Sequence, residues 1–371
     1  MPDQSEISEE EVKNVLSLKG QDWLSDRIKA KSKEIRVEEG KRLEEGLHAQ
    51  NLHDELIQSC ISAFNPESEC CRDSGYKFTT VEPLNELKVK NFDVLLFNEV
   101  QELGIFVECK TDCSDWSKEV THAYQAIEDL ERNIAYLEGE LKLNIRQKEY
   151  VMCVPSEHEN SVANAIEAQE KMGRVDAKVD PLLLIWGIHL FSSNQKIQLF
   201  TRIHSKRDDF KKHHRDKKLT SLLTTGVSTS SEVLAAFFPS SHPIKVFPGA
   251  VPWILRENQR AGRDLTVFPK SLPVSYFTDS RNLPHYSRMS IGADFAERFI
   301  REGTELQLME EVPGDKTKLK FTSKGKTRKT IHTNYKKAYM DWYLEKNIAR
   351  RAERMAVVEY LKIQATLVRY E

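Results

Sequence analysis

The chain has 371 residues, enough for two domains, because single hydrophobic cores usually stop growing near about 250–300 residues. Charged residues make up 30% of it and the formal net charge is −2, so the whole protein is not a polycation that would bind nucleic acid indiscriminately. No apolar run approaches the roughly 20 residues that span a bilayer, and the acidic N-terminus lacks a secretory signal, so we expect a cytoplasmic, intracellular protein without a membrane partner.

The N-terminal part, residues 1–44, is predicted to be a charged helical segment. Ser8-Glu9-Glu10-Glu11 resembles a capping box, which opens a helix. Helical periodicity then returns and ends at the helix-breaking pair Asn65-Pro66, so we expect a core-facing helix there. The apolar positions of this second helix are Leu52, Leu56, Ile57, Cys60, Ile61 and Phe64.

Three β-strands are predicted next. A short β-prone piece covers Tyr76 to Val81, and two apolar strands cover Phe92 to Phe97 and Gly104 to Lys110. The six residues between the apolar strands suit a hairpin loop.

Helices and strands alternate in the following part of the chain. From Ser117 to about Leu143, apolar residues recur every three or four positions, which predicts a long amphipathic helix with a packing stripe. A strand at Tyr150 to Val154, a helix over about 159–172, and strands at 182–190 and 196–203 follow. This order predicts an α/β fold with a mixed β-sheet flanked by helices.

The predicted core domain therefore covers residues 45–203. Residues 204–231 form a basic and then Ser/Thr-rich linker, where we place the domain boundary. The remainder, 232–371, is expected to be a second, C-terminal domain of unassigned fold that helps to bind nucleic acid. It contains a predicted helix near 292–301 and a charged helical tail from Asn334.

Two basic stretches, 204–218 and 316–329, are either ordinary surface charge or contacts to nucleic acid. The second contains one aromatic residue, Phe321, which is too little for a base-stacking platform. His213 and His214 lie in the first stretch, and we expect them on a solvated surface rather than as a metal-ligand pair, because adjacent side chains point in different directions.

The chain contains six cysteines and no CxxC pair. This argues against a disulfide framework and against a zinc knuckle. Cys109 and Cys113 have a CxxxC spacing, but no second pair accompanies them, so we expect buried or idle thiols rather than a structural metal site.

One Glu-x-Lys triplet stands out among the five in the chain, because only Glu108 and Lys110 lie in an apolar predicted strand. Charges on such an element need a reason. Side chains alternate along a strand, so Glu108 and Lys110 share a face. If the hairpin turn is centred between Val100 and Gln101, the residue directly opposite Glu108 is Asp93.

Two opposed carboxylates would need a counter-charge. Directly opposed residues have Cβ atoms about 4.5–5.5 Å apart, and two unit charges about 5 Å apart repel by roughly 3 kcal/mol at an effective dielectric of about 20. Lys110 supplies one positive charge for two negative ones, whereas a divalent cation with oxygen ligands would neutralise both. A Mg²⁺ ion beside a lysine suits phosphodiester hydrolysis, because the metal lowers the pKa of a bound water and the lysine orients that water or stabilises the developing charge.

Asp93, followed after fourteen residues by Glu108-Cys109-Lys110 on consecutive strands, resembles the PD-(D/E)XK nuclease superfamily, which includes restriction enzymes, Holliday-junction resolvases and repair nucleases. The resemblance covers roughly residues 45–203 and implies a restriction-endonuclease-like core. It implies a Mg²⁺-dependent deoxyribonuclease, with Mn²⁺ able to substitute, acting on DNA in defence, restriction or repair. Phe92 stands where many members have proline, which leaves no subfamily signature to narrow the substrate.

The resemblance also implies roles for individual residues. Asp93 and Glu108 would be metal ligands, and the backbone carbonyl of Cys109 would add another. Lys110 would act in catalysis beside them.

Helix residues often complete the site in this family. A helix glutamate that joins the metal site would match Glu55, with Glu45 as the weaker candidate. A glutamine on the helix after the lysine strand would match Gln125.

Three other interpretations stay open. The charged trio could be a buried ion triad or an exposed hairpin edge. The protein could be a catalytically inactive nucleic-acid-binding protein on a nuclease scaffold. It could also be an interaction or scaffold protein, as the amphipathic helix at 117–143 suggests. The sequence leaves open whether the chain forms a homo-oligomer or needs an activating protein partner.

Overall fold

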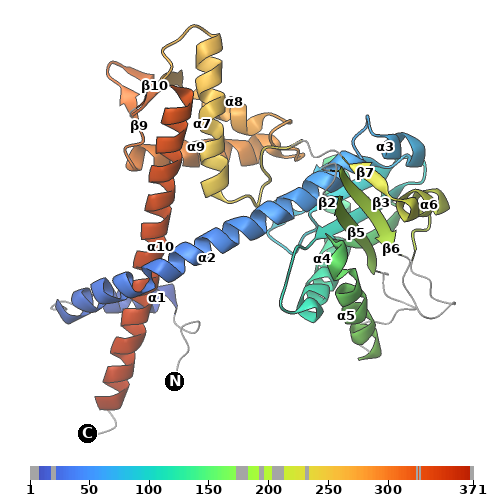
Figure 1. The fold of residues 1–371 in the computed structure, drawn as a ribbon, viewed down its shortest axis with the longest axis horizontal. Coiled ribbons are helices and arrows are strands. Elements are labelled where there is room, and N and C mark those ends of the chain that lie inside the picture. Colours follow the sequence, from blue (N-terminus) through green and yellow to red (C-terminus); the bar gives the residue numbers. More distant parts are fainter. Residues whose placement is uncertain are drawn as a thin grey trace. The chain divides into compact units, whose positions relative to one another are not determined.

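The computed structural model of the chain is drawn in Figure 1. It describes residues 8–17, 22–172, 183–191, 196–202, 213–229, 234–322, 325 and 327–367. Most of the first basic stretch, at 203–212, and Lys324 and Lys326 of the second lie outside the described residues.

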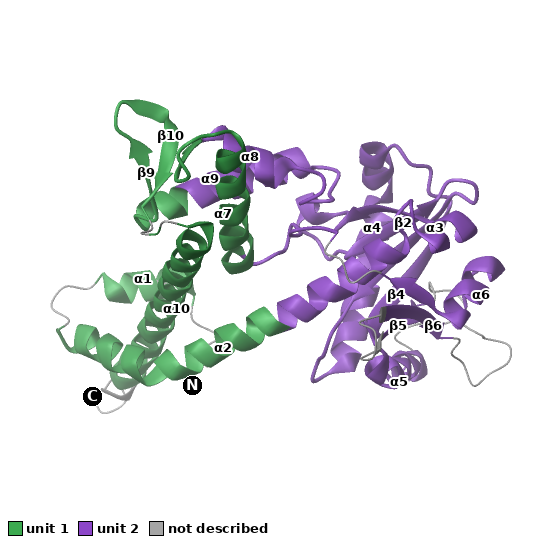
Figure 2. Cartoon of the chain, turned by 45° about the horizontal axis from the view of Figure 1, so that its top comes forward, with its two compact units in different colours: residues 1–48, 243–269, 301–371 green, residues 49–242, 270–300 purple. Residues whose placement is uncertain are grey.

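The chain divides into two compact units, each built from separated stretches of sequence (Figure 2). One unit comprises residues 1–48, 243–269 and 301–371, and the other comprises 49–242 and 270–300. This differs from the division into consecutive blocks that the sequence suggested, with boundaries near 44 and in 204–231.

The reason for the difference is long-range packing within each unit. In the first unit, the N-terminal residues Val12, Val15 and Leu24 are buried with residues 356–358. In the second unit, the side chain of Gln58 accepts hydrogen bonds from the backbone nitrogens of Leu234 and Ala235 at 2.9 and 3.1 Å. Neither set of contacts follows from local sequence patterns.

Helix α2 (Asp22–Ala63) is one continuous helix of 42 residues. The sequence predicted a charged segment and then a separate helix, but no residue between them breaks the helix. It ends directly before the Asn65-Pro66 region, as predicted. A shorter helix, α1 (Glu9–Leu16), precedes it.

The second unit is built on a mixed seven-stranded sheet in which the strands follow chain order from β1 to β7. Strands β3, β4 and β5 are parallel to one another, and the remaining neighbours pair antiparallel. The predicted α/β class is therefore confirmed. The strands are β1 (Lys77–Val81), β2 (Val94–Asn98), β3 (Leu103–Cys109), β4 (Gln147–Pro155), β5 (Leu183–Phe191), β6 (Lys196–Arg202) and β7 (Val227–Thr229).

Helices cover both faces of this sheet. One face packs against the C-terminal part of α2 and against α6 (Lys217–Thr225). The other packs against α4 (Trp116–Leu141) and α5 (Glu159–Lys171), whose apolar stripes are buried on it. Burial on both faces explains why β2 and β3 are continuous apolar runs rather than alternating ones.

Shorter elements complete this unit. Helix α3 (Glu69–Ser74) follows α2, and single 3₁₀ turns at Asn85–Leu87 and Ser156–His158 follow β1 and β4. Helix α8 (Ser271–Thr278) and most of α9 (Arg288–Glu305) belong here as well.

The first unit also contains a three-stranded antiparallel sheet in the order β8-β10-β9. Its remaining elements are α7 (Pro243–Arg260), β8 (Val267–Pro269), β9 (Met309–Val312), β10 (Asp315–Phe321) and α10 (Arg328–Leu367). Within the described parts of the chain, none of the helices is both long enough and apolar enough to cross a membrane.

Candidate active site at the carboxyl end of strand β3

Asp93 and Glu108 lie at the open end of the β2–β3 hairpin. The strand pairs run from Asn98 opposite Leu103 to Val94 opposite Val107, which is the register predicted from the hairpin length. Asp93 lies one residue before β2, and its backbone nitrogen donates to the carbonyl oxygen of Val107 at 2.9 Å, so the ladder does not continue regularly to the predicted pair of Asp93 and Glu108. The two carboxylates are still close enough for the charge of Asp93 to raise the pKa of Glu108.

The carboxylate of Asp93 is held by two donors. Its Oδ2 atom accepts a hydrogen bond from the backbone nitrogen of Cys109 at 2.6 Å and lies 3.3 Å from Nε2 of His53. Burial acts to raise the pKa of Asp93, but the charge and hydrogen bond of His53 and the charge of Lys110 outweigh it and lower this pKa. Asp93 is therefore ionised at neutral pH.

His53 is the positive partner of Asp93. Burial disfavours the charged imidazole, but the nearby carboxylate outweighs burial and raises the pKa of His53 to about 9. His53 belongs to the helix face that packs on the sheet, together with Ile57 and Cys60, which are fully buried one and two turns further along. This places the imidazole at the end of the strands where Asp93 lies.

Glu108 has one satisfied and one unsatisfied oxygen. Its Oε1 atom lies 2.8 Å from Nζ of Lys110, and its Oε2 atom is buried without a hydrogen-bond partner among the residues that the structure describes. Burial, followed by the charge of Asp93, raises the pKa of Glu108 to about 7, and Lys110 opposes this shift. The Oε2 atom of Glu108 is therefore available to bind a further positively charged group.

Lys110 follows the last residue of β3 and is anchored by its backbone, whose nitrogen donates to the carbonyl oxygen of Cys153 at 2.9 Å. Its Nζ atom contacts Glu108 and also Glu119, whose Oε2 lies 3.5 Å away on the first turn of α4. Burial acts against the charged amine, but these carboxylates and Asp93 raise the pKa of Lys110. The lysine is therefore a fixed cation between two acidic groups.

The helix residues that the sequence suggested are not the ones that reach the site. Glu55 is exposed on α2, because two residues of helix turn a side chain about 200° away from the direction of His53. Gln125 is exposed on α4, where Glu119 takes the position beside Lys110. Glu45 is also exposed and pairs with Lys41 at 3.6 Å.

The backbone and the side chain of Cys109 make different contacts. Its backbone nitrogen donates to Asp93. Its side chain is fully buried on the face of the sheet opposite to the side chain of Glu108, as strand alternation requires. The carbonyl of Cys109 as a metal ligand stays a prediction.

Sequence reasoning missed a third buried carboxylate, Glu82, directly after β1. Its backbone nitrogen donates to the carbonyl oxygen of Asp93 at 2.9 Å, and its Oε1 accepts from the backbone nitrogen and hydroxyl of Ser240 at 3.0 and 2.5 Å. Burial raises its pKa to about 7. Glu82 has a φ of 43°, an unusual value for a residue that is not glycine. No sequence pattern marks this residue.

His214 was expected on a solvated surface, and that prediction is wrong. It is buried with 1% exposure, its Nδ1 lies 2.6 Å from Oε2 of Glu149, and its Nε2 accepts from Nε1 of Trp186 at 2.8 Å. Both ring nitrogens are thus used inside the protein. His213 is exposed, as expected.

Comparisons with known proteins add little to this geometry. No protein-family model matches the chain, and no solved structure matches it. An archaeal protein of Archaeoglobus fulgidus, named only as uncharacterized, is 26% identical over 156 residues. The similar region covers 39% of this chain and 42% of that protein, so the chain spans less than half of its relative's length.

Proposed function

We propose that the chain is a Mg²⁺-dependent nuclease that hydrolyses DNA phosphodiester bonds, with a restriction-endonuclease-like core of the PD-(D/E)XK type over residues 45–203. One observation carries this proposal: Asp93, directly before β2, and Glu108, in β3, are close enough for their charges to interact, and Glu108 keeps a buried oxygen without a partner within the described chain. The preference for DNA over RNA rests on the resembled superfamily alone.

The residues present fit a hard divalent cation. Such ions take carboxylate oxygens as ligands, and the unpartnered Oε2 of Glu108 is an oxygen that a cation would satisfy. Asp93 and Glu108 would hold the ion, and Mn²⁺ would substitute for Mg²⁺. When bound, the ion would supply Lewis-acid polarisation of the phosphate and a water of lowered pKa.

The protein's own groups have separate tasks in this proposal. His53 and the amide of Cys109 keep Asp93 ionised and fix its orientation. Glu119 contacts Lys110 and helps to hold its amine beside Glu108. The ammonium group of Lys110 would bind a phosphate oxygen or orient the attacking water, because it is a compact cation with three donors.

A second candidate is a nucleic-acid-binding protein that keeps this scaffold without catalysis. It is favoured by one observation: His53 contacts Asp93 and Lys110 contacts Glu108, so each of these two carboxylates has a positively charged partner without a metal. The two candidates differ in whether a divalent cation displaces these partners and DNA is cut.

Cleavage assays separate the two. Supercoiled, linear, branched and single-stranded DNA, together with an RNA of matched sequence, are incubated with the protein in Mg²⁺, Mn²⁺ or EDTA. We expect metal-dependent cleavage that an Asp93→Asn, Glu108→Gln double variant loses and that an exposed control, Glu55→Gln, retains. Binding of DNA without cleavage under every metal condition would favour the inactive candidate. RNA cleavage with intact DNA would overturn the substrate assignment.

A further inference from the structure

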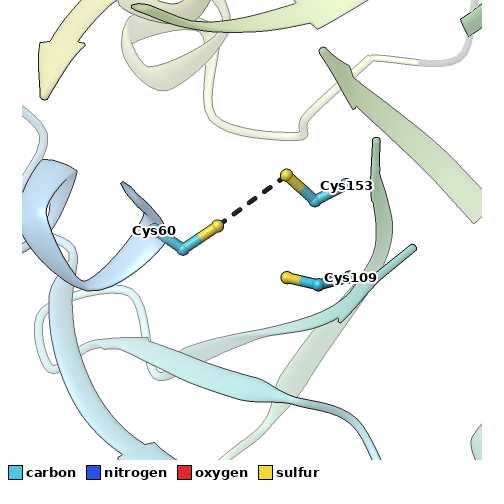
Figure 3. Close-up of side chains that lie close together, drawn as sticks. All are labelled: Cys60, Cys109 and Cys153. Atoms are coloured by element: carbon cyan, nitrogen blue, oxygen red, sulfur yellow. Dashed lines mark hydrogen bonds between the residues drawn. The ribbon is translucent and has the colours of Figure 1, made fainter. Parts of the chain in front are cut away.

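Three cysteine side chains meet in the core of the sheet unit (Figure 3). Cys60 comes from α2, Cys109 from β3 and Cys153 from β4, and their Sγ atoms all lie within 4.8 Å of one another. The Sγ atoms of Cys60 and Cys153 are 3.8 Å apart. All three residues have no exposed surface.

The fold, rather than a sequence motif, gathers these thiols. Cys109 and Cys153 are register partners on parallel strands and face the same side of the sheet. Cys60 lies on the stripe of α2 that packs on that side. Cys113, the other half of the CxxxC spacing, is not a member of the cluster. The spacing of cysteines in the sequence therefore did not reveal this cluster.

The distance between the sulfur atoms of Cys60 and Cys153 fits that between two thiolates on one metal ion. A thiolate binds a zinc-sized ion at about 2.3 Å, so three thiolates around one ion lie about 3.8–4.0 Å apart in tetrahedral or trigonal geometry. The 3.8 Å between Cys60 and Cys153 agrees with this edge length. It is far longer than the roughly 2.0 Å of a disulfide bond, and all three cysteines are free.

We propose that Cys60, Cys109 and Cys153 bind one soft d¹⁰ metal ion through three thiolates. The metal-ligating cluster, among the residues whose positions are described, contains these three side chains and no fourth ligand. Four ligands are usual for zinc, whereas Cu(I) is selected by soft sulfur ligands, so the three-sulfur set favours Cu(I) over Zn(II). Each thiol releases its proton to solvent when the metal binds, and the oxidation state of the metal does not change.

The location of this site gives it a structural role. One ion would link α2, the helix that carries His53, to β3, the strand that carries Glu108, and to β4. The soft-metal site would use the thiolates of three cysteines, whereas the proposed Mg²⁺ site would use the carboxylates of Asp93 and Glu108. The inference therefore does not depend on the nuclease proposal.

The test uses the reduced full-length protein under anaerobic conditions. Cu(I) is titrated against a competing chelator, and Zn(II) and Cd(II) are titrated in parallel while thiolate-to-metal charge-transfer absorption is recorded. Alkylation of the metal-free and the metal-loaded protein, followed by mass spectrometry, then shows which thiols the metal protects beyond their burial. We expect one equivalent of Cu(I), protection of Cys60, Cys109 and Cys153, and a rise in the melting temperature.

Variants make the assignment specific. Cys60→Ala should abolish the charge-transfer band, whereas Cys71→Ser and Cys113→Ser, which change cysteines outside the cluster, should retain it. No stoichiometric binding by the wild-type protein, or protection of Cys71 and Cys113 instead, would overturn the proposal even if Cys60→Ala failed to fold. Binding of Zn(II) without Cu(I) would overturn the three-coordinate assignment.

Discussion

The Nζ atom of Lys110 lies 2.8 Å from Oε1 of Glu108, and the same nitrogen lies 3.5 Å from Oε2 of Glu119. The lysine is thus shared between a carboxylate at the proposed metal site and one on the neighbouring helix. A cation that bound Glu108 would compete for that carboxylate and leave Lys110 available for a phosphate group. Variants of Glu108, in β3, and of Lys110, directly after β3, should consequently lose different properties.

Lys110→Ala should retain metal binding, because removal of a nearby positive charge makes the carboxylates more attractive to a cation. Cleavage should fall by roughly 10²–10³-fold, the loss typical of one electrostatic stabiliser. DNA binding should survive, since one lysine supplies one of many backbone contacts. Glu108→Ala should lose both metal binding and cleavage. Calorimetry and single-turnover kinetics measure these effects, and a Lys110→Ala variant that cleaves as fast as wild type would show that the lysine is structural.

His53→Gln should bind Mg²⁺ more tightly than wild type at pH 7.5, because a protonated His53 competes with the cation for Asp93. The gain should be roughly threefold to tenfold, as expected for about 1 kcal/mol between unit charges about 4 Å apart at the dielectric constant of water. The pKa of His53 is about 9, so the difference should disappear as the pH rises above that value.

The charge of His53, which weakens metal binding, should at the same time increase the folding stability of the metal-free protein. The folded-state pKa of His53 is raised above the ordinary 6.5, so this contribution is fully present below pH 6.5 and is lost as the pH rises through 9. Without metal, His53→Gln should therefore be less stable than wild type at pH 6. The exposed His48→Gln on the same helix is the control. Equal metal affinity in His53→Gln and wild type at pH 7.5 would contradict the competition.

Glu82→Gln should stabilise the protein at pH 8. The folded-state pKa of Glu82 is about 7 against an ordinary 4.5. The contribution of its protonated form to folding stability is therefore fully present below pH 4.5 and is lost as the pH rises through 7. The amide keeps an oxygen that accepts from Ser240 but carries no charge. The gain should be on the order of 1–3 kcal/mol at pH 8 and should vanish near pH 4.5. Denaturant unfolding at both pH values, with Glu55→Gln as an exposed control, measures it. Lower stability of Glu82→Gln at pH 8 would refute the prediction.

The lysines of β10 and the start of α10 should contribute to DNA binding. Lys316, Lys320 and Lys329 are exposed. Changing all three to alanine should weaken DNA binding and reduce the slope of log affinity against log salt by roughly two to three, because each phosphate contact contributes about 0.9. The matched control changes Lys13, Lys29 and Lys171, which are also exposed. An unaltered affinity and slope in the first triple variant would mean that this segment is solvated surface.

The parts of the site that lie on strands were predictable because strand geometry is local. Alternation put Glu108 and Lys110 on one face, and the length of the hairpin set the register of β2 and β3, which brings Asp93 to the end of β3 that carries Glu108. The helix contribution was not predictable in the same way, because it depends on how α2 is rotated against the sheet. His53 reaches Asp93, whereas Glu55, two residues later on the same helix, faces solvent.

Other features required tertiary structure from the outset. The hydrogen bonds of His214 to Glu149 and Trp186 join residues from distant parts of the sequence, and so does the meeting of Cys60 with Cys153. For His214, the basic run around it in the sequence predicted a solvated surface, whereas the side chain is buried. Burial of such residues is decided by the elements that pack over them.

The interleaved make-up of the two units has a consequence for synthesis on the ribosome. Arg27 pairs with Glu359, a residue 332 positions later, and Val12 and Val15 are buried with residues 356–358. The sheet unit ends at residue 300 and can complete its fold while residues 301–371 are still being made. The side chains of Val12, Val15 and Leu24 must wait for their partners at 356–358, and during that interval they are exposed to chaperones, proteases and other nascent chains.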